Sequence, residues 1–266
     1  MKLSAEILDI IFGLLVSQWK TLIACSKVPA LSQIVEKHLY YHTVVDIMGN
    51  TTDSDHVFKP DDLSNLASEK PHILNYIKIL EIQFTSSRYQ LPLNFADIFD
   101  KFAKTLLMFP VLECITLMTP DRYAAWYWST RFQAALEDRL NLPTMREVHF
   151  VGGQGVPYSF LGNSENIEHL SRSESFPAEG PDEFCASTVP QLKSLTLSMR
   201  SISSPLLTWL KLHSKELRSL KCSLSSVEEM VELFGVCSGT LNKLYIDVAD
   251  SECKVLALSR LIALLH

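Results

Sequence analysis

Two histidines come nearest, by type and spacing, to a metal-binding motif. His38 and His42 stand four positions apart, so on a helix both imidazoles would lie on one face, as in zinc-binding helices. No third ligand and no general-base glutamate lies between them. We therefore expect no bound metal and no cofactor.

Other segments that resemble catalytic motifs are incomplete. The run GGQG at 152–155 lacks the Lys-Ser/Thr that a phosphate-binding P-loop requires, and TTDSDH at 51–56 has the composition of a solvated loop. The chain has no G-x-S-x-G and no cysteine within a nucleophile motif. We expect no enzymatic activity. The alternative is an α/β hydrolase or transferase with an unfamiliar site, which requires a deep pocket lined by ionisable groups with shifted pKa values.

The cysteine pattern and the net charge indicate the cellular compartment of the protein and the classes of partner that it can bind. The six cysteines are scattered without a C-x-x-C pair, which is typical of buried thiols in a reducing compartment, so we expect a cytoplasmic or nuclear protein. Thirty acidic and 24 basic residues give a formal charge of -6, which disfavours nucleic acid and membranes as partners. Glu6 and Asp9 interrupt the apolar N-terminal run, so we expect no signal sequence.

Residues 1–15, MKLSAEILDIIFGLL, predict an almost wholly apolar helix. Ser4 is placed to cap its first turn. The polar positions form one narrow stripe: Lys2, Glu6, Asp9 and Gly13. The remaining apolar arc is wider than packing against one domain requires. The helix is either fully buried or contacted on one side by its own chain and on the other by a partner.

The segments LSAEILDIIFGLL and TLIACSKVPALSQIVEKHLYYHTVVDI, in this order, resemble the F-box. F-box segments begin with an L-P-x-E-I-L-x-x-I-F helix, continue into a T-L-x-x-C-x-x-V helix and end near H-L-F/Y before the first strand. The resemblance implies a three-helix module that binds the adaptor subunit of an SCF-type cullin-RING ubiquitin ligase. The residues that it assigns to adaptor binding are Leu3, Glu6, Ile7, Leu8, Ile11, Phe12, Leu15, Leu22, Cys25 and Val28.

Three positions depart from the F-box pattern. Ser4 replaces the usual proline, and Ser32 stands where the family has a tryptophan that fills the small core of the module. Pro29 falls where the second helix should continue, and its missing N–H and its ring predict a break there. These departures favour an alternative in which the N-terminal helices only cap the following domain.

An L-x-x-L-x-L pattern recurs through the rest of the chain, as in VPQLKSLTLS at 189–198. Its middle anchors are Leu80, Ile115, Val148, Leu195, Leu220 and Leu244. The last two intervals, of 25 and 24 residues, match leucine-rich repeats, for which about 20–29 is usual. A weaker rung in NIEHLS, with Ile167 and Leu170, divides the longest interval.

Helical patterns alternate with these strand patterns. Their apolar faces are Phe95, Ile98, Phe99, Phe102 and Leu106; Ala125, Trp128, Phe132, Ala135 and Leu136; Val227, Met230, Val231 and Phe234; and Leu258, Leu261, Ile262 and Leu265. Parallel neighbouring strands need such crossover connections. We expect an α/β leucine-rich-repeat solenoid after a small all-α F-box-like module. A compact doubly wound sheet is the alternative, but it has no need to repeat one signature.

The chain divides into an F-box-like helical module at 1–48, a linker and the helix that leads into the repeats at 49–71, and an irregular leucine-rich-repeat domain at 72–266. PHILNYIKILEI resembles the opening of the repeat domain in F-box proteins of the leucine-rich type. Residues 49–61 predict an exposed loop, and 152–188 a Gly/Ser/Pro/Glu-rich insertion. The sequence stops after a helical pattern without a polar capping repeat, which favours truncation or self-association.

Strand side chains alternate between the core and a surface that a partner can touch. That surface includes Glu81, Thr116, Glu147 and His149, and the part expected to bind a target protein is Ser194, Thr196, Ser198, Ser219, Lys221, Ser223, Lys243, Tyr245 and Asp247, with Tyr245 as the main anchor. The expected function is a non-catalytic substrate-recognition subunit of an SCF-type ubiquitin ligase. The alternative is a leucine-rich-repeat interaction scaffold without a ligase role.

Overall fold

The computed structural model describes residues 4–47, 57–84, 95–124, 128–154, 164–174, 192–199, 204–223 and 227–247. Its elements are α1 (Ala5–Leu14), α2 (Trp19–Ser26), α3 (Ser32–Tyr40), β1 (His42–Asp46), β2 (Val57–Phe58), α4 (Pro60–Glu69), the 3-10 helix η1 (Pro71–Asn75), β3 (Ile79–Gln83), α5 (Phe95–Leu106), β4 (Cys114–Ala124), α6 (Thr130–Leu140), β5 (Glu147–Gln154), β6 (His169–Glu174), β7 (Ser194–Met199), α8 (Ser204–His213), β8 (Ser219–Ser223), α9 (Val227–Cys237) and β9 (Lys243–Asp247). Among these helices, none is long and apolar enough to cross a membrane.

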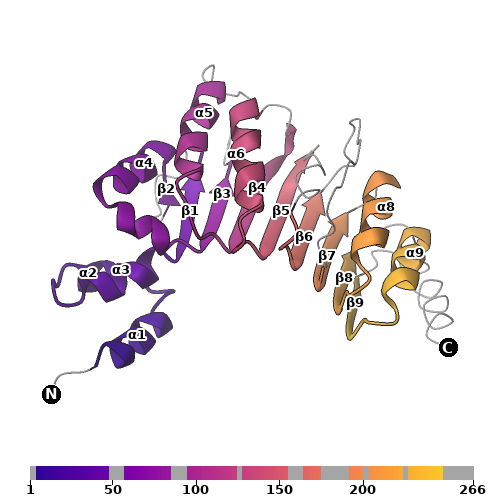
Figure 1. Ribbon diagram of the computed structural model, residues 1–266, viewed down its shortest axis with the longest axis horizontal. Coiled ribbons are helices and arrows are strands. Elements are labelled where there is room, and N and C mark those ends of the chain that lie inside the picture. Colours follow the sequence, from indigo (N-terminus) through magenta and orange to yellow (C-terminus); the bar gives the residue numbers. More distant parts are fainter. Residues whose placement is uncertain are drawn as a thin grey trace.

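A single nine-stranded sheet connects these elements (Figure 1). The strand order is β2-β1-β3-β4-β5-β6-β7-β8-β9, and every neighbouring pair is parallel. From β3 to β9 the order in space is the order in the chain, and α4, α5, α6, α8 and α9 lie along one side of the sheet (Figure 1). A doubly wound sheet reverses its strand order and carries helices on both faces. The described residues therefore form a solenoid-like α/β fold.

One pair of backbone hydrogen bonds recurs from strand to strand. The carbonyl of Tyr41, just before β1, accepts from the N–H groups of Lys78 and Ile79 at 3.1 and 3.0 Å. The carbonyl of Lys78, just before β3, accepts from Glu113 and Cys114 at 2.8 and 3.0 Å. The same paired contact is made by the carbonyls of Glu113, Arg146, Glu168, Lys193 and Arg218. Equivalent units are thus stacked by an equivalent connection, as in repeat proteins.

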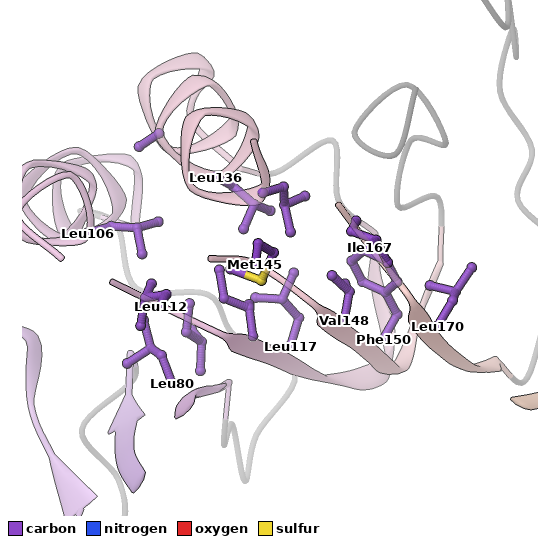
Figure 2. Close-up of a cluster of buried hydrophobic side chains, with 14 of the residues drawn as sticks. Leu80, Leu106, Leu112, Leu117, Leu136, Met145, Val148, Phe150, Ile167 and Leu170 are labelled. Atoms are coloured by element: carbon purple, nitrogen blue, oxygen red, sulfur yellow. The ribbon is translucent and has the colours of Figure 1, made fainter. Parts of the chain in front are cut away.

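The core lies between the sheet and its helices. The anchors predicted from the repeat pattern, together with the weaker rung, stand in one row across the strands: Leu80, Ile115, Val148, Leu170, Leu195, Leu220 and Leu244. All except Leu244 are buried. Figure 2 shows Leu106 of α5 and Leu136 of α6 facing this layer beside Leu112 and Met145. Each fully buried leucine contributes about 1.5–3 kcal/mol, so the row stabilises every step of the sheet.

The three N-terminal helices enclose a small separate cluster of Phe12, Leu22, Val35 and Leu39. The Ser4 side chain accepts a hydrogen bond from the Ile7 N–H at 3.4 Å, which confirms the predicted cap. Helix α2 ends at Ser26, before Pro29, in agreement with the predicted break. Trp19 packs against the cluster from α2, whereas Ser32 begins α3.

Helix α3 connects this cluster to the sheet. It leads directly into β1, and the Tyr40 ring lies 6.2 Å from that of Phe58 in β2, measured between ring centroids. The Glu36 carboxylate lies 2.7 Å from Lys70 Nζ and 3.2 Å from His72 Nε2. The N-terminal helices are therefore held against the first strands by apolar and ionic contacts.

Several sequence predictions differ from the structure. Residues 49–61 are not wholly an exposed loop, because Val57–Phe58 pairs with β1 and Pro60 begins α4. The proposed insertion at 152–188 contains the end of β5 and all of β6. Helix α8 was not anticipated, since its apolar residues do not form a single face. The segment TTDSDH and the helix expected near 258–265 lie outside the described residues.

Candidate functional site

Helix α1 presents an apolar stripe to solvent, formed by Ile7, Ile10, Ile11 and Leu14. These residues are spaced i, i+3, i+4 and i+7, so they share one face. Their exposed fractions are 46%, 66%, 39% and 79%. The possibility of a fully buried first helix is therefore wrong for the described residues. Exposed apolar side chains gathered on one helix are typical of a docking surface.

Ionic contacts hold α1 in this orientation. Lys37 Nζ donates to Asp9 at 3.1 Å, and His38 Nε2 lies 2.7 Å from Asp9 Oδ1. The hydrogen bonds from His38 and Lys37 keep the pKa of Asp9 below its ordinary value. Both partners lie on α3, while Leu8, Phe12 and Leu15 pack on the small cluster. Contacts with the chain thus use one side of α1 and leave the α1 stripe uncovered.

The predicted adaptor-binding residues fall into two groups. Glu6, Ile7, Ile11 and Val28 are exposed, whereas Leu8, Leu15 and Cys25 are half-buried and Leu3 lies outside the described residues. Phe12 and Leu22 are buried in the cluster, where the chain itself covers them. The sequence list also missed Ile10 and Leu14, the most exposed members of the α1 stripe.

The second candidate surface is the face of the sheet opposite the helices, here named the open face. Side chains on this face stand in rows between the buried rows of the core. One row runs Glu81, Thr116, His149, Ser171, Thr196, Lys221 and Tyr245. Because the strands are parallel and in register, residues of different strands lie beside one another on this face.

All nine residues predicted to bind a target lie on the open face of β7, β8 and β9. Their three rows are Ser194, Ser219 and Lys243; Thr196, Lys221 and Tyr245; and Ser198, Ser223 and Asp247. Tyr245 is 59% exposed and is the largest apolar surface among them. Hydroxyl groups with two lysines, one tyrosine and one aspartate make this end of the face polar, with one net positive charge among the nine residues.

Further along the same face the structure brings together three residues that sequence reasoning did not group. Cys114 of β4 stands opposite Glu147 of β5, and His149 lies two residues after Glu147. One ligand atom of each lies within 4.8 Å of the others, and His149 Nε2 is 3.0 Å from Glu147 Oε1. Burial, followed by the negative charge of Glu147, raises the pKa of the Cys114 thiol to about 12. The thiol is therefore protonated at neutral pH.

The histidine pair singled out in the sequence is not brought together. His38 lies on α3 beside Asp9, whereas His42 begins β1 and lies 3.3 Å from Glu81. The prediction that they share one helical face is wrong, because α3 ends at Tyr40. The run at 152–154 belongs to β5, where Gly152 has a φ of 69°.

Comparison of the chain with protein-family models, with curated proteins and with solved structures found no match in any of the three. The class defined by the coordinates is an α/β protein built on one parallel sheet, with helices in the described residues at its N-terminal end and along one face.

Proposed function

We propose that this chain is a non-catalytic substrate-recognition subunit of an SCF-type ubiquitin ligase. In this proposal residues 1–48 act as an F-box-like module and the following strands and helices as irregular leucine-rich repeats. The α1 stripe docks on the adaptor subunit, and the open face of β7, β8 and β9 holds the target protein.

The observation that carries the proposal is the exposed α1 stripe. An amphipathic helix that buried its apolar side within its own chain would leave only polar residues outside. Here Leu8, Phe12 and Leu15 supply the internal contact, and a second apolar side formed by Ile7, Ile10, Ile11 and Leu14 remains. This arrangement supports a partner that fits an apolar helix into a groove.

In the proposed mechanism the chain holds the adaptor and the target protein at a fixed separation. The α1 stripe lies at one end of the molecule, and β9 lies near the other (Figure 1). A rigid connection holds two bound proteins at a fixed separation, which raises the effective concentration of one near the other. Ubiquitin transfer itself is performed by other subunits, so no catalytic group is required of this chain.

The test is direct binding of the purified full chain to the purified adaptor, measured by calorimetry. We expect a one-to-one complex with the intact chain. Ile10→Asp together with Leu14→Asp should weaken binding at least about 100-fold, because two apolar contacts of about 1.5 kcal/mol or more are lost and two charges are placed in the groove.

Leu212→Asp is the matched control. Leu212 lies on α8 and is 54% exposed, so the substitution also adds a charge to an exposed apolar position. It should leave adaptor binding unchanged. An intact chain with a folded circular-dichroism spectrum and no measurable affinity for the adaptor contradicts the proposal.

The alternative is a leucine-rich-repeat interaction scaffold in which the N-terminal helices cap the sheet. The contacts of Glu36 with Lys70 and His72 favour it, because they bind α3 to the first repeat elements. Under this alternative the open face still binds a protein, but the double substitution in the α1 stripe leaves that binding and the cellular level of the bound protein unchanged.

A further inference from the structure

The group formed by Cys114, Glu147 and His149 has the geometry of an incomplete metal shell. Cys114 and Glu147 are register partners on adjacent strands, and Glu147 and His149 point to the same face because strand side chains alternate. Their ligand atoms lie within 4.8 Å of one another. In a tetrahedral zinc site the ligand atoms are about 3.3–3.8 Å apart, given zinc–ligand distances of about 2.0–2.3 Å. Closing the group thus needs side-chain movements of about 1 Å.

The donor types point to one metal. A thiolate is a soft ligand that magnesium and calcium do not favour, whereas sulfur, imidazole nitrogen and carboxylate oxygen together suit zinc. Cys114 thiolate and Glu147 carboxylate would neutralise the two positive charges of the ion. Glu81 of the neighbouring strand β3 stands in the same open-face row as Thr116 and His149, and it adds negative charge on this side of the group.

The backbone makes this group rigid. Cys114 and Glu147 each donate an N–H to the carbonyl before the preceding strand, at 3.0 Å in both cases. These are the hydrogen bonds that recur along the whole sheet, so the separation of the two Cα atoms is fixed by the fold. A preorganised set of ligands binds a metal without the cost of ordering a loop.

We propose that Cys114, Glu147 and His149 bind one zinc ion on the open face of the sheet. Three protein ligands leave a fourth position directed toward that face, which water or a ligand atom of a bound molecule fills. As the sulfur–zinc bond forms, the Cys114 thiol releases its proton to solvent. No oxidation state changes, so no redox partner is needed. The proposal is independent of any adaptor or ligase role.

The test is titration of the metal-free full chain with Zn²⁺ and with Co²⁺. We expect one zinc per chain, a rise in the thermal unfolding midpoint as zinc is added, and a thiolate-to-cobalt charge-transfer band with Co²⁺. Cys114→Ser should abolish that band. Glu147→Gln and His149→Gln should each weaken zinc binding more than the about 10–100-fold that loss of an outer-shell contact causes.

Two controls separate this site from adventitious binding. Cys222→Ser removes another buried thiol, in the core of β8, and His72→Gln removes an exposed imidazole from η1, outside the sheet. Both should leave zinc affinity and the cobalt spectrum within about twofold of the intact chain, a change of about 0.4 kcal/mol. Glu147→Gln keeps the side-chain shape, so it provides a readout if Cys114→Ser disturbs folding.

Failure of the intact chain to bind zinc, or equal affinity in all five variants, overturns the proposal. Neither outcome bears on adaptor binding, because the α1 stripe lies on a different element and is assayed with a different partner.

Discussion

At the scale of single residues, the position of a side chain in the strand alternation decides its role. Leu195 and Thr196 are neighbours on β7, but Leu195 is fully buried and Thr196 lies on the open face. We expect Leu195→Ala to lower the free energy of unfolding by about 2–5 kcal/mol, since it leaves a cavity in the core row. Urea denaturation followed by circular dichroism measures this loss.

Thr196→Val is the matched control, because it keeps the branched shape and changes only a group outside the core. Its effect should stay within about 0.5 kcal/mol. Comparable losses at both positions would mean that β7 does not have one buried and one open face.

Substitution of two glycines by alanine should change the stability of the chain in opposite directions. A methyl group at Gly13 of α1 would lie 3.6 Å from His38 Cε1, which is an ordinary contact, so Gly13→Ala should stabilise the chain by about 0.5–1 kcal/mol. Gly152 has a φ of 69°, which costs a residue with a Cβ about 1–2 kcal/mol. Thermal unfolding of the two variants tests the difference, and a shift in the same direction for both contradicts it.

The residues of the candidate sites were only partly predictable from the sequence. The open-face residues of β7, β8 and β9 follow from alternation alone, because an anchor row fixes which positions point away from it. The side of α1 that packs against its own chain could not be predicted from the sequence. Its apolar arc is too wide to show which residues are buried and which are exposed. Cys114 lies on β4 whereas Glu147 and His149 lie on β5, and only the register of these two strands places the three residues together.

At the scale of elements, the joint between α3 and the start of the sheet should be sensitive to acid. Burial opposes ionisation of Glu36, but hydrogen bonds from Lys70 and His72 outweigh it and lower the pKa of Glu36 below its ordinary value of 4.5. When the pKa of a carboxyl group is lower in the folded state than in the unfolded state, the group stabilises the folded state at every pH above the unfolded-state pKa. This contribution disappears as the pH falls through the folded pKa.

Glu36→Gln tests this joint. At pH 6–7 the variant should be less stable than the intact chain by about 1 kcal/mol, a modest value because Lys70 and His72 are about half exposed. The difference should shrink below pH 4.5 and vanish in stronger acid. Thermal unfolding of both proteins across this pH range measures it, and a difference that is constant with pH contradicts the assignment.

Elements with regular apolar spacing were predictable, and the exceptions have physical reasons. Strands β3 to β8 each carry buried residues two apart, which is the signal that the repeat pattern reports. In β9 the equivalent residues Leu244 and Ile246 are half-buried. Strand β2 has only two residues, too few to show alternation. In α8 the buried Leu210 stands two positions from the exposed Leu212, so the sequence shows no single apolar face.

At the scale of the whole molecule, the order of the strands determines how stability is distributed. Strand β3 pairs with β1 and β4, each of β4 to β8 pairs with the strand before it and the strand after it, and no pairing among the described strands joins distant parts of the sheet. In such an arrangement stability is close to a sum of local terms and nearest-neighbour terms. In a closed globule a single substitution lowers the stability of all slowly exchanging amides together.

Native-state hydrogen exchange of Leu220→Ala distinguishes these two behaviours. Leu220 is buried in β8, and its truncation removes core contacts that β7 and β9 share. A loss of about 2–5 kcal/mol should speed exchange in β7, β8 and β9 by more than about tenfold. Exchange in β1, β3 and β4 should stay within about twofold of the intact chain, and Lys221→Gln on the open face should change neither group. An equal acceleration in all these strands would show that the sheet unfolds as one unit, and nearest-neighbour stacking would then not account for its stability.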